Sequence, residues 1–120
     1  MDITSTQVEI IQLDNLSRPQ FLALAIETSK RMGWVFRNVN QTGFIAYTCN
    51  GLFAWNAEIV LKIIEKSASI QSKSISDGLI DVRENRKNIK KFIAIFKELK
   101  NSWAAEELIP VYERIKMNFS

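Results

Sequence analysis

The residues that most enzymes use for acid–base and nucleophilic chemistry are scarce in this sequence. The chain has no histidine and a single cysteine, Cys49. Because histidine is the commonest general base and metal ligand at neutral pH, histidine-dependent hydrolase and metal sites are excluded within this chain. A nucleophilic Cys49 would need a base, and its apolar neighbours indicate a small core residue instead. One cysteine also excludes an intrachain disulfide and a cysteine-rich metal site.

Two pairs of carboxylates are close enough in sequence to suggest cation binding or acid–base chemistry. Asp77 and Asp81 flank a predicted turn, and Glu106 with Glu107 opens the last predicted helix. Neither pair has the spacing of a calcium loop, and turn formation or a favourable helix N-terminus explains each. Nucleotide, zinc and redox motifs are missing as well. The sequence therefore predicts a protein that is not an enzyme, with no catalytic residue, no metal site and no cofactor.

A basic stretch could provide an electrostatic binding surface. Seven cations and two glutamates lie between Arg83 and Lys100. Such a cluster can bind phosphate, nucleic acid or an anionic membrane surface. The alternative is the solvated side of an amphipathic helix, and it is favoured because no aromatic residue interleaves with the charges to stack on a base. The candidate anion-binding residues are Arg83, Arg86, Lys87, Lys90 and Lys91.

Aromatic residues cluster in the predicted hairpin region in the first half of the chain. They occupy both parities of predicted strands, so they cannot all point into one core. Those left outside would form an apolar patch for a protein partner, or would line a cavity for a small apolar ligand. Ordinary core packing is the remaining alternative. The candidate partner or ligand surface comprises Trp34, Phe36, Tyr47, Phe53 and Trp55.

A long strand beginning near Leu52 organises the elements that would position these residues. Apolar and polar residues alternate along it from Trp55 to Ile63, which is typical of a half-buried strand. After a turn at Glu65, a strand from Ala68 to Ile75 is rich in Ser, Gln and Lys. So polar a strand is expected at a sheet edge, or with one face in water, where Lys73 would discourage edge pairing.

Two helices are predicted on either side of the strands. The first begins after the N-cap Ser17, has Pro19 in its first turn and continues to Met32. The second covers residues 84–103, with a one-sided apolar stripe that includes Phe92 and Phe96. A final helix, which Pro110 should kink, carries a stripe of Leu108, Val111, Tyr112, Ile115 and Phe119.

The remaining strands are predicted at Val8–Leu13, Trp34–Val39 and Gly43–Cys49, with an Asn50–Gly51 turn leading into the long strand. The composition, 47% hydrophobic and 24% charged, is that of an ordinary globular fold, and 120 residues predict one domain over 1–120. The order is β-α-β-β-β-β-α-α. We therefore expect an α+β fold, a curved antiparallel sheet with helices packed on one face. The element order resembles that of the TATA-binding-protein-like arrangement.

Several short runs carry a resemblance to a family of proteins. The sequence Gly43-Phe-Ile-Ala-Tyr-Thr, Trp55 with Glu58, Ser72, and Asn85-Arg-Lys-Asn-Ile-Lys-Lys-Phe resemble a family of small uncharacterised bacterial α+β domains. Members of that family occur alone or next to membrane segments, including rhomboid-type proteases. Where members carry a tryptophan before the Asn-x-Lys-Asn-Ile run, this chain has Val82 and Arg83. The resemblance implies an accessory module and supplies no active residue.

The sequence thus predicts a non-enzymatic interaction or accessory module that binds a protein partner or self-associates. Anion, nucleic-acid or acidic-membrane binding through residues 83–100 is one alternative, and a small apolar ligand between sheet and helices is another. The first residues, Met1 to Gln7, have neither the basic nor the apolar region of a signal peptide. No apolar run approaches the ~20 residues of a transmembrane segment. We therefore expect a cytoplasmic location.

Overall fold

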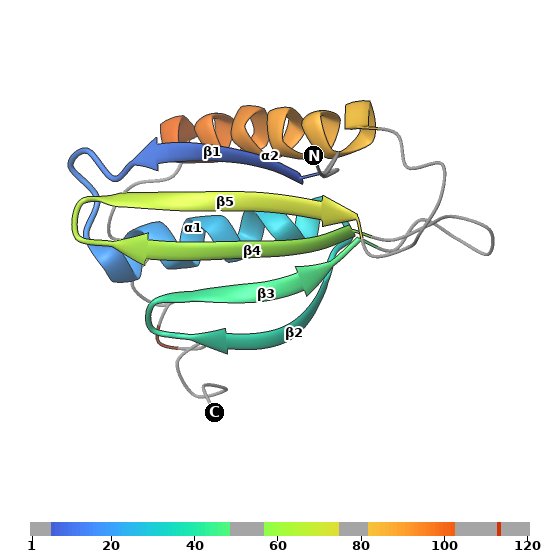
Figure 1. Ribbon diagram of the computed structural model, residues 1–120. Coiled ribbons are helices and arrows are strands. Elements are labelled where there is room, and N and C mark those ends of the chain that lie inside the picture. Colours follow the sequence, from blue (N-terminus) through green and yellow to red (C-terminus); the bar gives the residue numbers. More distant parts are fainter. Residues whose placement is uncertain (1–5, 49–56, 75–81, 103–112, 114–120) are drawn as a thin grey trace.

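The computed structural model describes residues 6–48, 57–74, 82–102 and 113. Within them, a five-stranded antiparallel sheet carries two helices on one side, the α+β architecture expected from the sequence (Figure 1). The predicted order holds from the first strand to the second helix, whereas the predicted last helix lies outside the described residues. The elements are β1 (Thr6–Gln12), α1 (Arg18–Arg31), β2 (Val35–Asn40), β3 (Gly43–Tyr47), β4 (Ala57–Ile64), β5 (Ser67–Ser74) and α2 (Val82–Ser102).

Helix α1 begins where its local sequence signals predict. The Ser17 hydroxyl accepts a hydrogen bond from the backbone N–H of Gln20 at 3.2 Å, and Gln20 Oε1 accepts from the Ser17 N–H at 2.8 Å. This reciprocal capping box satisfies two donors at the helix start. Pro19 lies in the first turn, and Gly33 follows the last turn with a φ of +77°. The prediction of a helix from Ser17 to Met32 is confirmed.

Strand β4 has the alternation predicted for the organising strand. Ala57, Ile59, Leu61 and Ile63 are buried, whereas Lys62 and Ile64 on the other parity are exposed. The inward residues face the helices because successive side chains of a strand point to opposite faces of the sheet. The predicted start of this strand at Leu52 and the Asn50–Gly51 turn lie outside the described residues.

The strand order β1-β5-β4-β3-β2 corrects one expectation. The polar strand β5 is not an edge strand, because it pairs with β1 on one side and β4 on the other. Its inward residues are small or apolar, and Ala68, Ile70 and Ser72 are all buried. Its polar residues mostly lie on the opposite face, which fits the second expectation, a strand with one face towards water. Strands β1 and β2 form the two edges.

The core lies between the sheet and the helices. Ile59 and Leu61 of β4 and Phe92 and Phe96 of α2 are at most 2% exposed. This confirms the prediction that the inward residues of the long strand and the apolar stripe of the second helix share one core. Phe96 of α2 packs against Phe21 of α1 with ring centroids 4.8 Å apart. These contacts fix the position of α2 over the β1 half of the sheet, where α2 contacts both β1 and β5.

No described helix covers the opposite face of the sheet, here called the open face. Val8 and Ile10 of β1 are 47% and 57% exposed there, and Ile64 of β4 is 61% exposed. The cross-strand register places Val8 beside Gln71 and Ile10 beside Ser69. Apolar side chains therefore border water on the β1 side of this face. Among the described residues, neither helix is long and apolar enough to cross a membrane.

Candidate functional site

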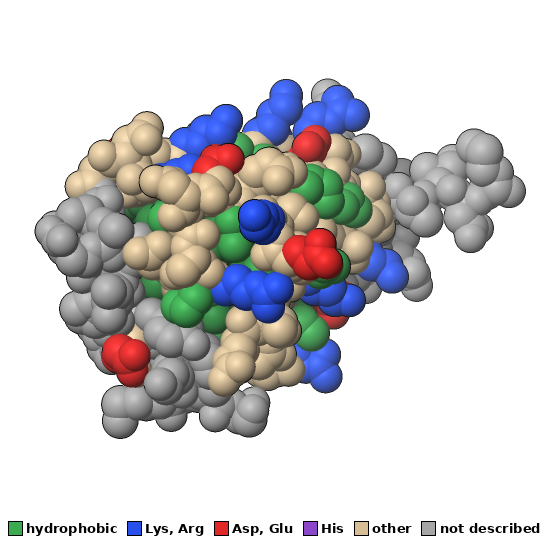
Figure 2. All heavy atoms as spheres, turned by 90° about the vertical axis from the view of Figure 1, so that its left-hand side faces the viewer, with side chains coloured by type: hydrophobic (Ala, Val, Ile, Leu, Met, Phe, Trp, Pro, Cys, Tyr) green, Lys and Arg blue, Asp and Glu red, His purple; other side chains and the backbone are tan. Residues whose placement is uncertain are grey.

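The predicted anion-binding residues lie along α2, and helical spacing divides them between two surfaces. Arg86, Lys87, Lys90 and Lys91 are all exposed. The side chain of Arg83 lies outside the described part of the structure. Lysine and arginine side chains gather at the top of Figure 2, where α2 lies in Figure 1.

The division between the two surfaces follows from the 100° turn per residue of an α-helix. Residues spaced by three and four fall on one stripe. One such stripe borders β1, and we call it the groove stripe. Lys87 and Lys91 lie on the outer side of α2, away from that stripe. The groove stripe consists of Arg86, Lys90, Ile93, Lys97 and Lys100. Of these, Ile93, Lys97 and Lys100 lie beside residues of β1, and helical spacing continues the stripe to Lys90 and Arg86.

The predicted aromatic surface is not one exposed patch. Trp34 is only 7% exposed, and its ring stacks on Phe92 with centroids 5.6 Å apart and planes 3° from parallel. It is therefore a core residue and not part of a partner surface. Phe36 is half-buried and meets Phe44 edge to face at 5.2 Å. The local sequence around Trp34 does not predict this burial, because the ring that covers it, Phe92, belongs to α2 and lies far along the chain.

Tyr47 lies on the open face and takes part in a chain of polar contacts. Arg37 Nη1 donates to the Tyr47 hydroxyl at 3.1 Å, and that hydroxyl donates to Glu58 Oε2 at 3.5 Å. These contacts tie β2, β3 and β4 together. Phe53 and Trp55 lie outside the described residues, as do Cys49 and the carboxylate pairs singled out in the sequence.

A groove runs between the outer edge of β1 and α2, and we call it the β1–α2 groove. It has a volume of about 360 Å³. Ile93 and Phe96 contribute apolar surface, and Lys97 and Lys100 contribute cations. The complete lining comprises Glu9, Ile10, Ile11, Gln12, Asp14, Ile93, Phe96, Lys97 and Lys100.

One wall of this groove is an unpaired strand edge. The Leu13 N–H donates to the Lys66 carbonyl at 2.9 Å, which continues the β1–β5 ladder beyond Gln12. In an antiparallel pair, successive residues direct their N–H and C=O groups to alternate sides. Odd-numbered residues of β1 therefore bond to β5, and the even-numbered residues direct theirs to the free edge. Those outward residues are Thr6, Val8, Ile10 and Gln12. Among the described strands, none pairs with this edge.

A buried polar cluster fixes α2 above β5 and so sets the groove's other wall. The Ser72 hydroxyl donates to Asn85 Oδ1 at 2.8 Å, and Asn88 Nδ2 donates to the Ser72 hydroxyl at 3.3 Å. Ser72 and Asn85 are both fully buried. Buried polar groups of this kind define one register, because any shift would leave them unsatisfied. The cluster therefore sets which residues of α2 face β1.

An ion pair holds the other end of α2 beside β1. Lys100 Nζ lies 3.0 Å from Asp14 Oδ2, and the two residues are 86 positions apart in sequence. Asp14 has a φ of +57°, in the left-handed region that aspartate tolerates better than most residues. The groove is thus bounded at this end by a salt bridge.

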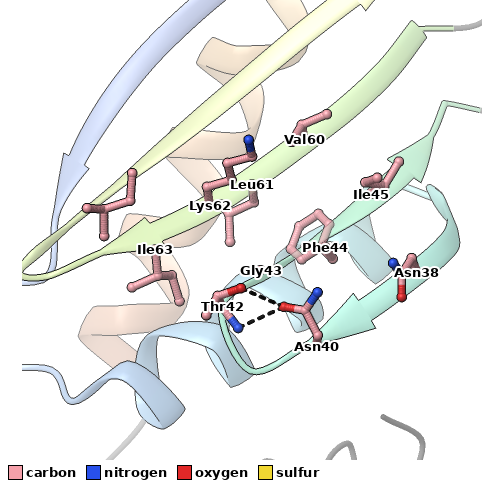
Figure 3. A pocket seen from close by; sticks show the side chains of 11 residues that line it. Asn38, Asn40, Thr42, Gly43, Phe44, Ile45, Val60, Leu61, Lys62 and Ile63 are labelled. Atoms are coloured by element: carbon pink, nitrogen blue, oxygen red, sulfur yellow. Dashed lines mark hydrogen bonds between the residues drawn. The ribbon is translucent and has the colours of Figure 1, made fainter. Parts of the chain in front are cut away.

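A second hollow lies on the open face beside the β2–β3 turn and has a volume of about 340 Å³ (Figure 3). Its polar side chains are largely engaged in shaping the turn. Asn40 Oδ1 accepts from both the backbone N–H and the hydroxyl of Thr42, each at 2.8 Å. Lys62 is the only charged residue in its lining. This hollow offers fewer ligand-directed groups than the β1–α2 groove.

The described residues contain no group of three or more His, Cys, Asp or Glu side chains that could hold a metal ion. Aromatic and aliphatic side chains occupy the interior between the sheet and the helices. Binding of a small apolar ligand there stays a prediction. No protein-family model matches the chain, and no curated protein matches it. The resemblance to the bacterial domain family likewise stays a prediction.

The sequence singled out the basic helix but missed the groove. Its two walls come from the start and the end of the described chain, so no local motif marks it. Natural edge strands commonly carry charges, lysine or proline to prevent pairing. Thr6–Gln12 contains a single charge and neither proline nor lysine, but the same is true of Val35–Asn40 at the other edge. Composition therefore does not tell the two edges apart.

Proposed function

We propose that this protein is a non-enzymatic interaction module that binds an extended segment of a partner protein by strand addition to the free edge of β1. The β1–α2 groove is the observation that carries this proposal. It combines unpaired backbone groups, an apolar surface and cations in one place. In strand addition, main-chain hydrogen bonds supply affinity and neighbouring side-chain pockets supply specificity.

The backbone of β1 supports the proposal. Its pairing with β5 runs without a register shift from Thr6 to Gln12, so the free edge is a regular template. Each outward residue offers both a donor and an acceptor. Such an edge, when long and uncovered, is prone to pair with another chain.

The surroundings of the edge also support it. Ile93 is partly buried against the core, and it lines the groove together with Phe96. An incoming side chain on the helix side would contact this apolar surface, whereas one on the open face would contact Val8 and Ile10. Both faces of an added strand would therefore bury apolar area, and that area is the main driving force for association.

Selection from a phage-displayed library of random twelve-residue peptides, with the full chain as bait, tests the proposal. Selected peptides are then synthesised and added to the ¹⁵N-labelled protein. Amide hydrogen exchange should slow at Val8, Ile10 and Gln12, because their N–H groups become bonded to the peptide. No enriched peptide, or a bound peptide that leaves these amides exchanging as before, would overturn the proposal.

Two variants at one position separate the backbone from the side chain. Ile10→Pro removes an outward N–H and should weaken peptide binding at least ~10-fold. Ile10→Thr keeps the N–H and should bind within ~3-fold of the parent. Equal binding by Ile10→Pro would contradict strand addition. A dimer with β1 amides protected in the absence of peptide would show that the occupant is a second copy, which would contradict the partner version.

The gathering of cations on α2 favours a second candidate, binding of an anionic surface through Arg86, Lys87, Lys90 and Lys91. In that case the affinity for single-stranded DNA or for phosphatidylserine vesicles should fall steeply with salt. It should also fall with the Lys87→Glu/Lys91→Glu double substitution on the outer side of α2. Undetectable binding of both probes at low salt would exclude this candidate.

A further inference from the structure

The two sides of the free β1 edge differ in chemistry, and the difference specifies what an added strand should carry. The helix side is bordered by the groove stripe, in which cations flank Ile93. The open-face side is bordered by Val8 and Ile10, which are 47% and 57% exposed. We infer that the partner segment has a five-residue core with acidic residues at its first and last positions and β-branched apolar residues at the three between. This inference rests on the proposed strand addition at β1.

The geometry of a sheet fixes which partner residues meet which wall. An added strand would lie ~4.8 Å beyond β1, with alternate side chains on opposite faces. Directly opposed residues share a face. Partner residues opposite Gln7, Glu9 and Ile11 would therefore face α2, and those opposite Val8 and Ile10 would lie on the open face.

The spacing along α2 matches this pattern. Lys90 and Lys97 are seven residues apart, which is ~10.5 Å along a helix. Two strand residues four apart are separated by ~13 Å. Gln7 pairs with Ser72, which bonds to Asn88 near the start of α2, so a partner residue opposite Gln7 would lie within reach of the flexible Lys90 side chain. A partner residue opposite Ile11 would lie near Lys97, which lines the groove together with Ile11.

The middle position on the helix side should be apolar for two reasons. Ile93 lies between the two lysines on the groove stripe and offers apolar surface. Glu9 lies directly opposite that position, and its carboxylate would repel an acidic partner residue. Acidic residues are therefore favoured only at the two ends of the core.

The balance of charge along the groove favours an acidic partner. The groove lining itself holds two cations, Lys97 and Lys100, against two carboxylates, Glu9 and Asp14, and Arg86 and Lys90 add two cations further along the same helix stripe. Lys100 is already paired with Asp14 at 3.0 Å. The remaining cations give the helix side a net positive charge. The pattern reads the same in both directions, so it does not depend on whether the partner runs parallel or antiparallel to β1.

Two synthetic peptides of identical composition test the pattern. Both are nine residues long, acetylated and amidated, with two threonines at each end. One has the core Glu-Val-Val-Val-Glu, and the other has Val-Glu-Val-Glu-Val. Titration of each into the full chain should show that the first binds at least ~10-fold more tightly. Equal affinities would overturn the inference.

A charge exchange with a matched control tests the assigned lysines. Lys90→Glu/Lys97→Glu should weaken binding of the Glu-Val-Val-Val-Glu peptide ~10- to 30-fold and should permit binding of the Lys-Val-Val-Val-Lys analogue. Lys87→Glu/Lys91→Glu changes the net charge equally but lies away from the groove. At 150 mM salt, where the screening length is ~8 Å, it should change binding less than ~3-fold.

The outcomes separate this inference from the proposed function. Equal losses in the two double variants, with the β1 edge amides still protected by bound peptide, would overturn the acidic pattern and leave strand addition intact. Binding that leaves the amides of Val8 and Ile10 unprotected would overturn strand addition, and the inference with it. Failure of both peptides to bind the parent chain would overturn the inference, and the library-selected peptides would then decide on strand addition.

Discussion

The two edges of the sheet are built differently. Strand β1 pairs with β5 without a register shift, whereas the β2–β3 pairing shifts between Phe36 and Asn38. The extra residue in β2 is Arg37, whose side chain bonds to Tyr47. Bulges and charged residues are common devices for preventing further strand pairing. The β2 edge therefore carries both a bulge and a charge, whereas the β1 edge carries one charge, Glu9, and no bulge.

The surroundings of the two edges reinforce this difference. Helix α2 contacts β1 and forms a groove beside it. Inside the sheet, β3 approaches β4 very closely at Gly43, where an added Cβ would overlap the Leu61 carbonyl. Of the two edges, β2 is thus bulged and β1 is regular and lies beside a groove. This contrast is why we assign partner binding to the β1 edge.

The close approach of β3 to β4 at Gly43 predicts the largest effect on stability. Gly43→Ala should destabilise the protein by ~2–6 kcal/mol, because a side chain would meet the β4 backbone at a φ of +153°. Urea unfolding measures the change. Gly33→Ala is the control, since Gly33 also has a positive φ but has no atom within 4 Å of an added Cβ. It should cost only ~1 kcal/mol. Equal losses would show that β3 and β4 are not in close contact at Gly43.

The polar anchor on the β1 side predicts the next effect. Ser72→Ala removes a hydroxyl that bonds to Asn85 and Asn88, and should cost ~1–3 kcal/mol. Ser69→Ala changes the same residue type on the open face of the same strand and should stay within ~0.5 kcal/mol. Thermal unfolding of both variants provides the comparison. A cost at Ser69 as large as that at Ser72 would contradict the role of the buried cluster.

Successive residues of β1 direct their N–H groups either to β5 or to the free edge, so a proline should destabilise the protein to different extents at neighbouring positions. Glu9→Pro removes an N–H directed to β5 and leaves the Ile70 carbonyl without its ladder partner, at a cost of ~1–3 kcal/mol. Ile10→Pro removes an outward N–H and should cost under ~1 kcal/mol. Chemical denaturation of both variants checks the alternation. The reverse order would mean that the even-numbered residues of β1 bond to β5.

How far the sequence predicted the molecule depended on whether the signal was local. The start of α1 could be predicted, because Ser17, Pro19 and Gln20 form their capping contacts within one turn. The buried residues of β4 could also be predicted, because alternate residues of a strand become buried whenever helices pack on one face of its sheet. Both predictions rest on neighbouring residues.

The position of β5 and the groove could not be predicted in the same way. The pairing of β5 with β1 brings together segments that are separated by α1, β2, β3 and β4. The polar composition of β5 suggested an edge strand. Composition does not show that the inward Ser72 hydroxyl is hydrogen-bonded to Asn85 and so can be buried. Trp34 was a candidate for a partner or ligand surface, with core packing as the alternative, because the ring on which it stacks, Phe92, lies far along the chain. Contacts between distant segments decide these cases, and no local pattern encodes them.

The smallest effect concerns the ion pair that closes the groove beside β1. Lys100→Met removes the contact with Asp14 but keeps most of the aliphatic side chain, so the loss should be only ~0.2–1 kcal/mol. Asp14 is 62% exposed, and solvent and salt therefore screen the attraction. Urea unfolding measures the difference in the free energy of unfolding between Lys100→Met and the parent, and this difference should shrink as salt rises to ~1 M. Lys97→Met, for which the structure shows no ion pair among the described residues, should have no such salt dependence. If both variants respond to salt alike, the Asp14–Lys100 contact does not hold the end of α2 against the β1 margin, and only packing and the buried Ser72 cluster maintain the open groove.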